Sequence, residues 1–422
     1  MSDHPWDGAD PGPPEHVVIV GAGIVGLSCA WFLQERGVHV TVVDRSQEFS
    51  GASAGNAGFI SPAHCVPLPE PSLLRYGLRA ILDPRSPVSV PLRGDLRRAK
   101  FLVEMMGHCT SSTWRRSMSA YVPLNALAIG AYDAQRSGGV SADFTTADIL
   151  SGFKDPREAS GLLEEFSGVV GAGQPIDIEL LTANEAHRLE PHLSPAVRFG
   201  VLLRDQRFVT PYKYGEALAR SVRERGGEII DDSLVTEVVR ADDRVIARTL
   251  AREYGADAIV LANGAWVSKL AIAHGVRVPV HAGRGYSFTV PIDSPLVQPV
   301  HFPGSRLGVT PDGDRVRVVG VMEFDEADAP LRSSRINSMI RALKPLLAGI
   351  NWDKRSDDWV GPRPLTSDGM PLIGKTATRG IYVGSGHGMW GMTLGPVTGQ
   401  LLAEEITTGR TPEEIRPFSP LR

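Results

Sequence analysis

The sequence predicts an α/β protein in which a parallel sheet is built from both ends of the chain and an antiparallel sheet lies between them. Three patterns predict this class. Residues 16–44 have the pattern strand, helix, strand, and residues 380–409 have the pattern strand, glycine-rich loop, helix. Residues 283–324 alternate with a period of two around a Pro–Asp–Gly turn. Parallel elements that enclose an antiparallel block indicate two interleaved domains.

The first unit begins with HVVIV (His16–Val20), an apolar β-branched run that is typical of a buried strand. The following segment, GIVGLSCAWFLQERG, carries apolar residues at helical spacing and ends at Gly37, a common helix stop. VHVTVVD then supplies a second strand that ends at Asp44. Such units build parallel sheets with right-handed connections.

The middle of the chain mixes helices and short strands. Residues 62–95 are rich in proline and turn residues, and residues 97–136 have the texture of two helices. Further along we expect helices over 156–173, 212–227 and 333–350, a strand over 198–211 that ends in a turn, short strands over 228–250, and a buried strand over 256–266 that runs into a glycine loop.

The composition of the 422-residue chain is that of an ordinary soluble globular protein, with a formal net charge of −4. This charge argues against a nucleic-acid partner, and the basic segments LRRAK and TWRRS fit a solvated helix face. The three cysteines are odd in number and far apart, which argues against a disulfide framework and a metal cluster. Neither a secretory leader nor an apolar run long enough to span a membrane is evident. We expect a cytoplasmic protein, and peripheral contact with the inner face of the membrane stays open.

GAGIVG, which contains Ile24 and Val25, indicates a dinucleotide site. Gly21 permits the turn after the strand, Gly23 lets the backbone approach a pyrophosphate, and Gly26 lets the helix pack closely. The helix N-terminus offers free N–H groups to phosphates. Asp44 follows Gly26 by eighteen residues, and its carboxylate suits ribose hydroxyls but repels a 2′-phosphate. NADP is therefore disfavoured, while NAD and FAD both fit this motif.

Two further glycine-rich stretches favour the longer cofactor. SGASAGNAGFISP (50–62) places bare backbone directly after the strand that ends in Asp44. GSGHGMWGMT (384–393) leads into a helix that begins near Met392. The N-terminus of this helix would stabilise negative charge on a reduced flavin. The sequence therefore predicts that both ends of the chain hold one FAD.

The chain resembles the D-amino acid oxidase (DAO) family of FAD-dependent oxidoreductases, and within it the bacterial D-amino acid dehydrogenases. The stretches that carry the resemblance follow one another in the same order over nearly the whole chain: IVGAGIVGLSCAWFLQERGVHVTVVDR, GNAGFISP, GRGYSFTVPI, WVGPRPLTSDGMPLIG and GSGHGMWGMTLGPVTGQLL. It implies an FAD-binding Rossmann-type (glutathione-reductase-like) domain, interleaved with an α+β substrate domain that has an antiparallel sheet. We expect a flexible lead-in over 1–15, FAD-binding parts over 16–80, 185–275 and 358–422, and substrate parts over 81–184 and 276–357.

The resemblance also implies roles for particular residues near the FAD. Besides Gly21, Gly23, Ile24, Val25, Gly26 and Asp44, the cofactor would meet Arg45, Ser53, Asn56, Ala57, Gly58, Val235, Ala262, Gly264, His387, Gly388, Met389, Trp390, Gly391, Met392 and Thr393. None of Cys29, Cys65 and Cys109 is near the GPRP segment, where some relatives attach their flavin, so we expect non-covalent FAD.

Three residues are candidates for catalysis. Arg363 corresponds to the arginine that binds the substrate carboxylate in relatives, and a planar guanidinium suits a carboxylate. Tyr286 would place a phenol over the substrate, and His387 is either a proton carrier or a positioning residue beside the flavin. Dehydrogenase relatives carry a tyrosine just ahead of the strand LGVTP, where this chain has Ser305 and Arg306. This departure leaves the identity of the substrate open.

These features predict oxidative deamination of a small amino acid, a D-amino acid above all, by hydride transfer to flavin N5, which yields a 2-oxo acid and ammonia. Electrons would then pass to a quinone-like carrier or to oxygen. One alternative is an amine oxidase of the glycine, sarcosine or D-proline type that uses oxygen. Another is an RNA-modifying flavoprotein, which the net charge of −4 disfavours.

Overall fold

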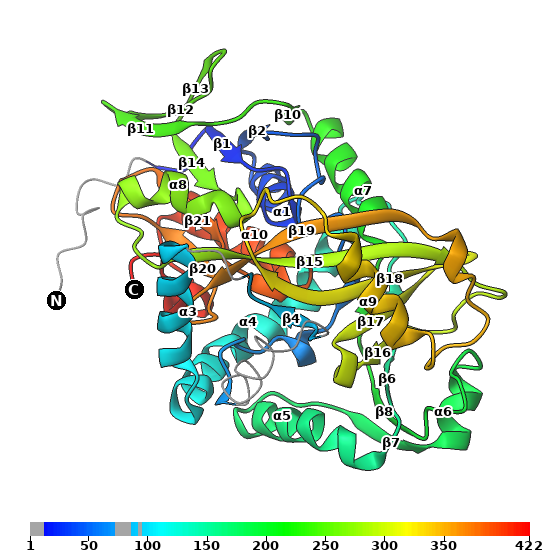
Figure 1. Cartoon of the computed structure of the whole chain (residues 1–422). Coiled ribbons are helices and arrows are strands. Elements are labelled where there is room, and N and C mark those ends of the chain that lie inside the picture. Colours follow the sequence, from blue (N-terminus) through cyan, green and yellow to red (C-terminus); the bar gives the residue numbers. More distant parts are fainter. Residues whose placement is uncertain (1–11, 72–85, 92–94) are drawn as a thin grey trace.

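The parallel sheet that the chain ends predict is present in the computed structural model, which describes residues 12–71, 86–91 and 95–422 (Figure 1). Every neighbouring pair in this sheet is parallel except the last, which is antiparallel. The six strands follow the order β10 (Glu228–Ile230), β2 (His39–Val43), β1 (His16–Val20), β14 (Ala258–Leu261), β21 (Ile381–Ser385) and β20 (Leu372–Lys375).

Both faces of this sheet are covered, as its apolar strands require. One core lies between the sheet and the helices α1 (Ile24–Gln34), α4 (Ser111–Ser137), α7 (Pro211–Glu224) and α10 (Gly391–Thr408). The other lies between the sheet and α8 (Val267–Ala271) with a three-stranded layer of β11 (Glu237–Ala241), β12 (Arg244–Arg248) and β13 (Glu253–Ala256).

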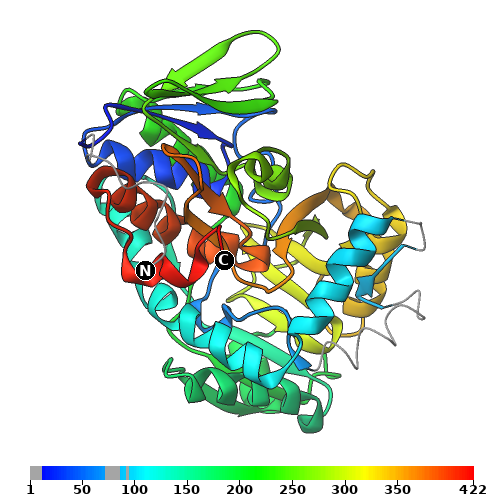
Figure 2. The same ribbon diagram turned by 90° about the vertical axis from the view of Figure 1, so that its left-hand side faces the viewer.

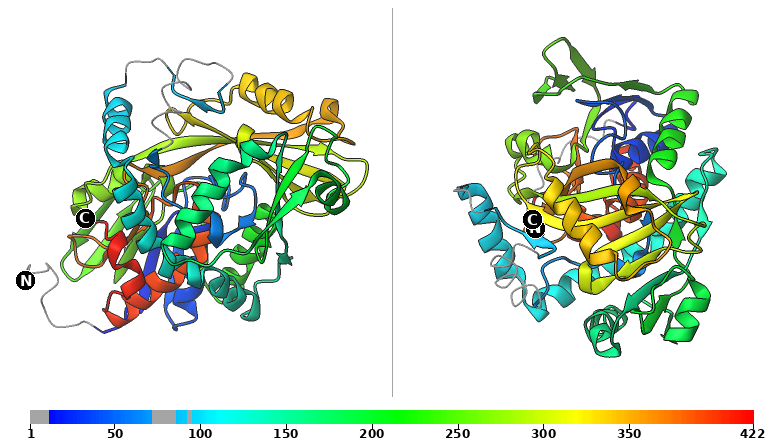
Figure 3. Two further views of the ribbon diagram at one scale, coloured as in Figure 1. Left: turned by 90° about the horizontal axis from the view of Figure 1, so that it is seen from below. Right: turned by 45° about the vertical axis from the view of Figure 1, so that its right-hand side comes forward.

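Helices α1 and α10 come from opposite ends of the chain and pack side by side, in blue and red in Figure 3. A glycine makes their close approach possible. A side chain added at Gly399 would place its Cβ 2.5 Å from the backbone nitrogen of Cys29. The pairing of these helices brings the first and last glycine-rich loops of the chain together.

The antiparallel block forms a nine-stranded sheet, whose yellow strands lie beside the first sheet in Figure 2. Helix α9 (Ser333–Leu343) packs on the face that turns away from the first sheet. The order is β19 (Ser356–Thr366), β15 (Val280–Pro291), β18 (Arg315–Phe324), β17 (Leu307–Asp312), β16 (Val300–Phe302), β6 (Ile149–Phe153), β8 (Phe199–Leu203) and β7 (Ile178–Thr182), with β4 (Val88–Ser89) beside β18.

The remaining elements surround these two sheets. The two helices expected over 97–136 are α3 (Leu96–His108) and α4, and they begin after the N-caps Asp95 and Thr110. Within the described ranges, no helix has the length and apolar character needed to cross a membrane. The other elements are β3 (Phe59–Ile60), β5 (Thr145–Thr146), α5 (Ser160–Gly171), α6 (Ala183–Leu189) and β9 (Arg207–Phe208).

The predicted fold class is confirmed, but the sheets do not follow the predicted domain boundaries. Strands β8 and β19 belong to the nine-stranded sheet, although 185–275 and 358–422 were assigned to the FAD-binding domain. Helix α4 packs in the core of the six-stranded sheet, although 81–184 was assigned to the substrate domain. The helical texture of a segment does not reveal which sheet it covers. Most of the lead-in over 1–15 lies outside the described residues, so its expected flexibility stays a prediction.

Candidate cofactor and substrate site

A cavity of about 770 Å³ lies between the two sheets, within the size range of cofactor sites. Residues from three glycine-rich segments line it, namely 20–25, 50–53 with 55–56, and 384–385 with 387–389 and 391–392. The edge strand β19 closes one end with residues 359–364, and the other end lies at Asp44 after β2. The expectation that both ends of the chain line one site therefore matches the position of this cavity.

The first glycine segment has the geometry that the motif predicts. Gly21 has a φ of +113°, and a Cβ there would lie 2.5 Å from the carbonyl oxygen of Ala262. A Cβ at Gly26 would lie 1.9 Å from the carbonyl oxygen of Gly21, so this glycine serves helix packing. At Gly23 the added atom would meet only the Ser53 hydroxyl, at 3.3 Å. The backbone at Gly23 is therefore bare toward the cavity.

The carboxylate of Asp44 is held by the backbone at the end of β2. It accepts hydrogen bonds from the backbone nitrogens of Ala22 at 2.6 Å and Ser46 at 3.0 Å. The side chain is half-buried and lines the cavity beside the N-terminus of α1. Its position after the second strand is the one expected of a residue that binds ribose hydroxyls.

His387 lies in the loop before α10 and is 2% exposed. Its Nε2 atom lies 2.8 Å from the hydroxyl of Thr398, and burial lowers the pKa of the imidazole to about 3. The ring is therefore neutral at physiological pH, which disfavours the proton-carrier role and favours the positioning role. A β-bridge between His387 and Leu365 holds the loop against β19.

Arg363 is half-buried on β19 and faces the cavity. Its Nη1 atom donates to the carbonyl oxygen of Val321 at 2.7 Å and lies 3.7 Å from the sulfur of Met322. Within the described part of the chain, Arg363 forms no ion pair with a carboxylate. Burial without such a partner lowers the pKa of the guanidinium to about 10. It stays protonated near neutrality and is positioned to bind an anion.

The bare backbone of β15 makes room for this guanidinium. A Cβ at Gly285 would lie 2.2 Å from Nη2 of Arg363 and 2.3 Å from its Cζ. Gly285 and Gly361 are register partners, and a Cβ at Gly361 would meet the ring of Trp359 at 2.1 Å. Glycines on two neighbouring strands therefore let Arg363 and Trp359 lie flat against the sheet.

Tyr286 does not reach the cavity, contrary to the prediction that it lies over the substrate. The residue is 1% exposed, and its hydroxyl donates to Glu323 Oε2 at 2.7 Å within the core behind the sheet. A Cβ at Gly285 would point at Arg363, which lines the cavity, and alternation along β15 turns Tyr286 to the opposite side. The phenol is therefore a satisfied core group.

The other predicted residues divide into two groups. Trp390 donates to the carbonyl oxygen of Val66 at 2.7 Å, and Thr393 bonds the backbone of Phe59 and Ser61, so both support the loop around β3. Gly26, Ala57, Gly58, Trp390 and Thr393 lie off the cavity wall. The wall includes Gly21, Gly23, Ile24, Val25, Asp44, Arg45, Ser53, Asn56, Val235, Ala262, Gly264, Arg363, His387, Gly388, Met389, Gly391 and Met392.

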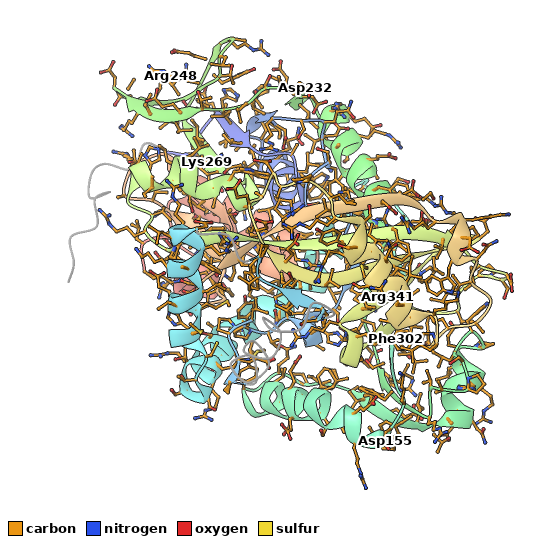
Figure 4. All side chains as sticks on the ribbon, viewed as in Figure 1. Asp155, Asp232, Arg248, Lys269, Phe302 and Arg341 are labelled. Carbon is orange, nitrogen blue, oxygen red and sulfur yellow. The ribbon has the colours of Figure 1, made fainter. Side chains whose placement is uncertain are left out.

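Some wall residues were not predicted as site residues. Trp359, Asp328 and Lys269 line the cavity, and Figure 4 labels Lys269 on α8. Trp359 lies two residues before the GPRP segment, and this proximity could have marked it as a site residue. Asp328 comes from an irregular stretch without a motif. The chain's three cysteines are buried, and none of them is among the residues that line the cavity.

A comparison with protein families supplies the classification. The model of the DAO family, described as FAD dependent oxidoreductase, matches residues 16–405. The chain belongs to this family. It is an FAD-dependent oxidoreductase, and the residues described above fit the cofactor: the bare backbone at Gly23, the N-termini of α1 and α10, and the carboxylate of Asp44.

Individual proteins are similar to this chain over almost its whole length. A D-amino acid dehydrogenase of Rhizorhabdus wittichii is 29% identical over 408 residues, which cover 94% of this chain and 97% of the relative. One of Cereibacter sphaeroides is 28% identical, with 94% and 92% covered. The glycine oxidase structure of Geobacillus kaustophilus shares the fold with a TM-score of 0.73 at 22% identity, covering 97% of this chain and 99% of that one.

Proposed function

We propose that this protein oxidises a small amino acid of D configuration to the 2-oxo acid and ammonia. The observation that carries the proposal is the half-buried guanidinium of Arg363 at the end of an FAD cavity, without a carboxylate partner among the described residues. Two relatives that are 28–29% identical over 94% of this chain are D-amino acid dehydrogenases, which supports the choice of substrate.

In this proposal Arg363 binds and orients the substrate. Its contact with the carbonyl oxygen of Val321 holds one side of the guanidinium and leaves other N–H groups for a carboxylate. Bidentate binding would set the direction of the Cα–H bond. FAD, when bound, supplies the acceptor for the hydride.

The chain's other residues supply shape and charge rather than proton transfer. The carboxylates of the cavity wall are Asp44, which follows β2, and Asp328, which bonds Arg45, and neither forms an ion pair with Arg363. His387 is neutral and bonded to Thr398. We therefore expect the amine to lose its proton to solvent before the Cα–H bond breaks.

The test is flavin bleaching without oxygen, with D- and L-amino acids, glycine and N-methylated amines compared on the wild type and on Arg363→Met. We expect D-amino acids to bleach the wild type fastest. Loss of two charge-assisted hydrogen bonds should slow bleaching by about 100-fold or more at equal substrate in Arg363→Met, with bound FAD unchanged. The matched control is Arg244→Met on β12, because Arg244 is exposed and, like Arg363, donates to a backbone carbonyl oxygen, that of Gly255. Equal bleaching of Arg363→Met and wild type would contradict the proposal.

A second candidate is an amine oxidase of the glycine, sarcosine or D-proline type. The specific observation in its favour is Ser305–Arg306, which occupies the place where dehydrogenase relatives are expected to carry a tyrosine. Arg306 does not line the cavity, and its charge acts on Glu165 and His301 instead. Hydrogen peroxide released in air with glycine or sarcosine would favour this candidate, and activity only with an added dye would favour the dehydrogenase.

A further inference from the structure

Asp328 connects two residues at the end of the cavity where β2 terminates. Its Oδ1 atom accepts a hydrogen bond from Nη2 of Arg45 at 2.6 Å, and its Oδ2 atom accepts one from Nε1 of Trp266 at 3.1 Å. The guanidinium carbon of Arg45 lies 4.0 Å from the centre of the Trp266 ring. All three side chains line the cavity. We call Arg45, Trp266 and Asp328 the clasp.

The clasp joins the two halves of the molecule. Arg45 lies just after β2 and Trp266 a few residues after β14, so both are attached to strands of the six-stranded sheet. Asp328 lies in the segment 325–332, which connects β18 of the nine-stranded sheet to helix α9. In Figure 1 this yellow segment rises from the large sheet toward the smaller one.

Ion pairs and hydrogen bonds at both ends of the segment 325–332 hold it in place. Arg332 closes its base by pairing with Asp325 at 2.8 Å and with Glu323 at 3.1 Å. Arg284, which is 1% exposed, pairs with Glu323 at 3.0 Å and donates to the carbonyl oxygens of Ala329 and Pro330. A buried charge network with this many partners costs much to open. This network therefore fixes the position of the segment that carries Asp328.

The clasp itself is much easier to open than its base. The side chains of Arg45 and Asp328 are 39% and 55% exposed, and ion pairs that exposed are weak and sensitive to salt. Ala327, Asp328 and Ala329 also form part of the cavity wall at this end. Opening between Asp328 and Arg45 would therefore uncover the cavity without disturbing either sheet.

We propose that the clasp retains FAD: Asp328 draws Arg45 across the cavity, and the cofactor leaves only after this contact opens. Arg45 then acts as part of the closure as well as a residue of the cavity wall. Because the ion pair is exposed and the ring of Trp266 lies beside it, we expect the clasp to slow the release of FAD by about tenfold.

The experiment measures how fast FAD appears in an ultrafiltrate after dilution of the holoenzyme. Asp328→Asn should release FAD about tenfold faster than the wild type, and the release should become insensitive to salt between about 0.05 and 0.5 M. Trp266→Phe keeps the ring under Arg45 but loses the Nε1 donor, so we expect a smaller increase. Glu179→Gln, which breaks the exposed Glu179–Arg204 pair on β7, is the matched control and should leave release unchanged.

Two results would overturn the proposal. One is release from Asp328→Asn at the wild-type rate and with the wild-type salt dependence. The other is an equal loss of melting temperature in the apoprotein and the holoenzyme of Asp328→Asn, which would make the contact a structural tie only. The experiment measures FAD release without any amino acid, so its result does not depend on which substrate the enzyme oxidises.

Discussion

Adding one methyl group at Gly285 should impair substrate binding without touching the cofactor. In Gly285→Ala the new Cβ would lie 2.2 Å from Nη2 of Arg363, and an ordinary contact begins at 3.4 Å, so the guanidinium must move by about 1.2 Å. Gly285 is paired with Gly361 on β19 and lies at an irregularity in the pairing with β18, so β19 restrains its backbone on one side. Misplacing a binding group by about 1 Å costs about 100-fold in rate, or about 2.7 kcal/mol.

The assay is the rate of flavin reduction in an anaerobic stopped-flow experiment, with the amino acid that bleaches the wild type fastest. Each run starts from equal absorbance of bound FAD, so that loss of cofactor is not mistaken for loss of orientation. Gly255→Ala is the matched control, because a Cβ at that strand position would meet nothing closer than 4.0 Å. A rate for Gly285→Ala within about threefold of the wild type would refute the idea that this glycine positions Arg363.

Two further predictions concern stability. Burial lowers the pKa of both His64 and His387 to about 3, so between that pH and about 6.5 the unfolded chain binds more protons than the folded one. The free energy of unfolding should therefore rise with pH through this window, by about 1.4 kcal/mol per pH unit for each histidine. The melting temperature measures this. A melting temperature that does not change from about pH 5 to 6.5, or that rises as steeply in His64→Gln as in the wild type, would contradict the prediction. Gly399→Ala would press a Cβ to 2.5 Å from the backbone of α1 and should cost about 1–3 kcal/mol in urea unfolding. Gly107→Ala on α3 has no atom within 4 Å of the new Cβ, and equal losses in the two variants would exclude crowding as the cause.

The cofactor end of the site could be predicted because its signals are local. A turn glycine, a helix N-terminus and a carboxylate after the next strand lie close together in the chain, and each follows from a few neighbouring residues. The role of Gly26 in helix packing was predicted in the same way, and the Cβ distance of 1.9 Å agrees with it. No such signal marks Asp328, because Asp328 and Arg45 are far apart in the chain and meet only where the two sheets lie side by side.

The sequence by itself determined the class of fold, the parallel unit at each end of the chain, the antiparallel block between them and the glycine-rich segments around the FAD cavity. Only the tertiary structure decided which of two neighbouring strand residues faces Arg363 in that cavity, Gly285 rather than Tyr286, and which sheet each helix covers. The physical reason is that both faces of β15 are buried. Alternation shows that neighbours point in opposite directions, but without a solvent-exposed face the pattern does not tell which direction leads to the cavity.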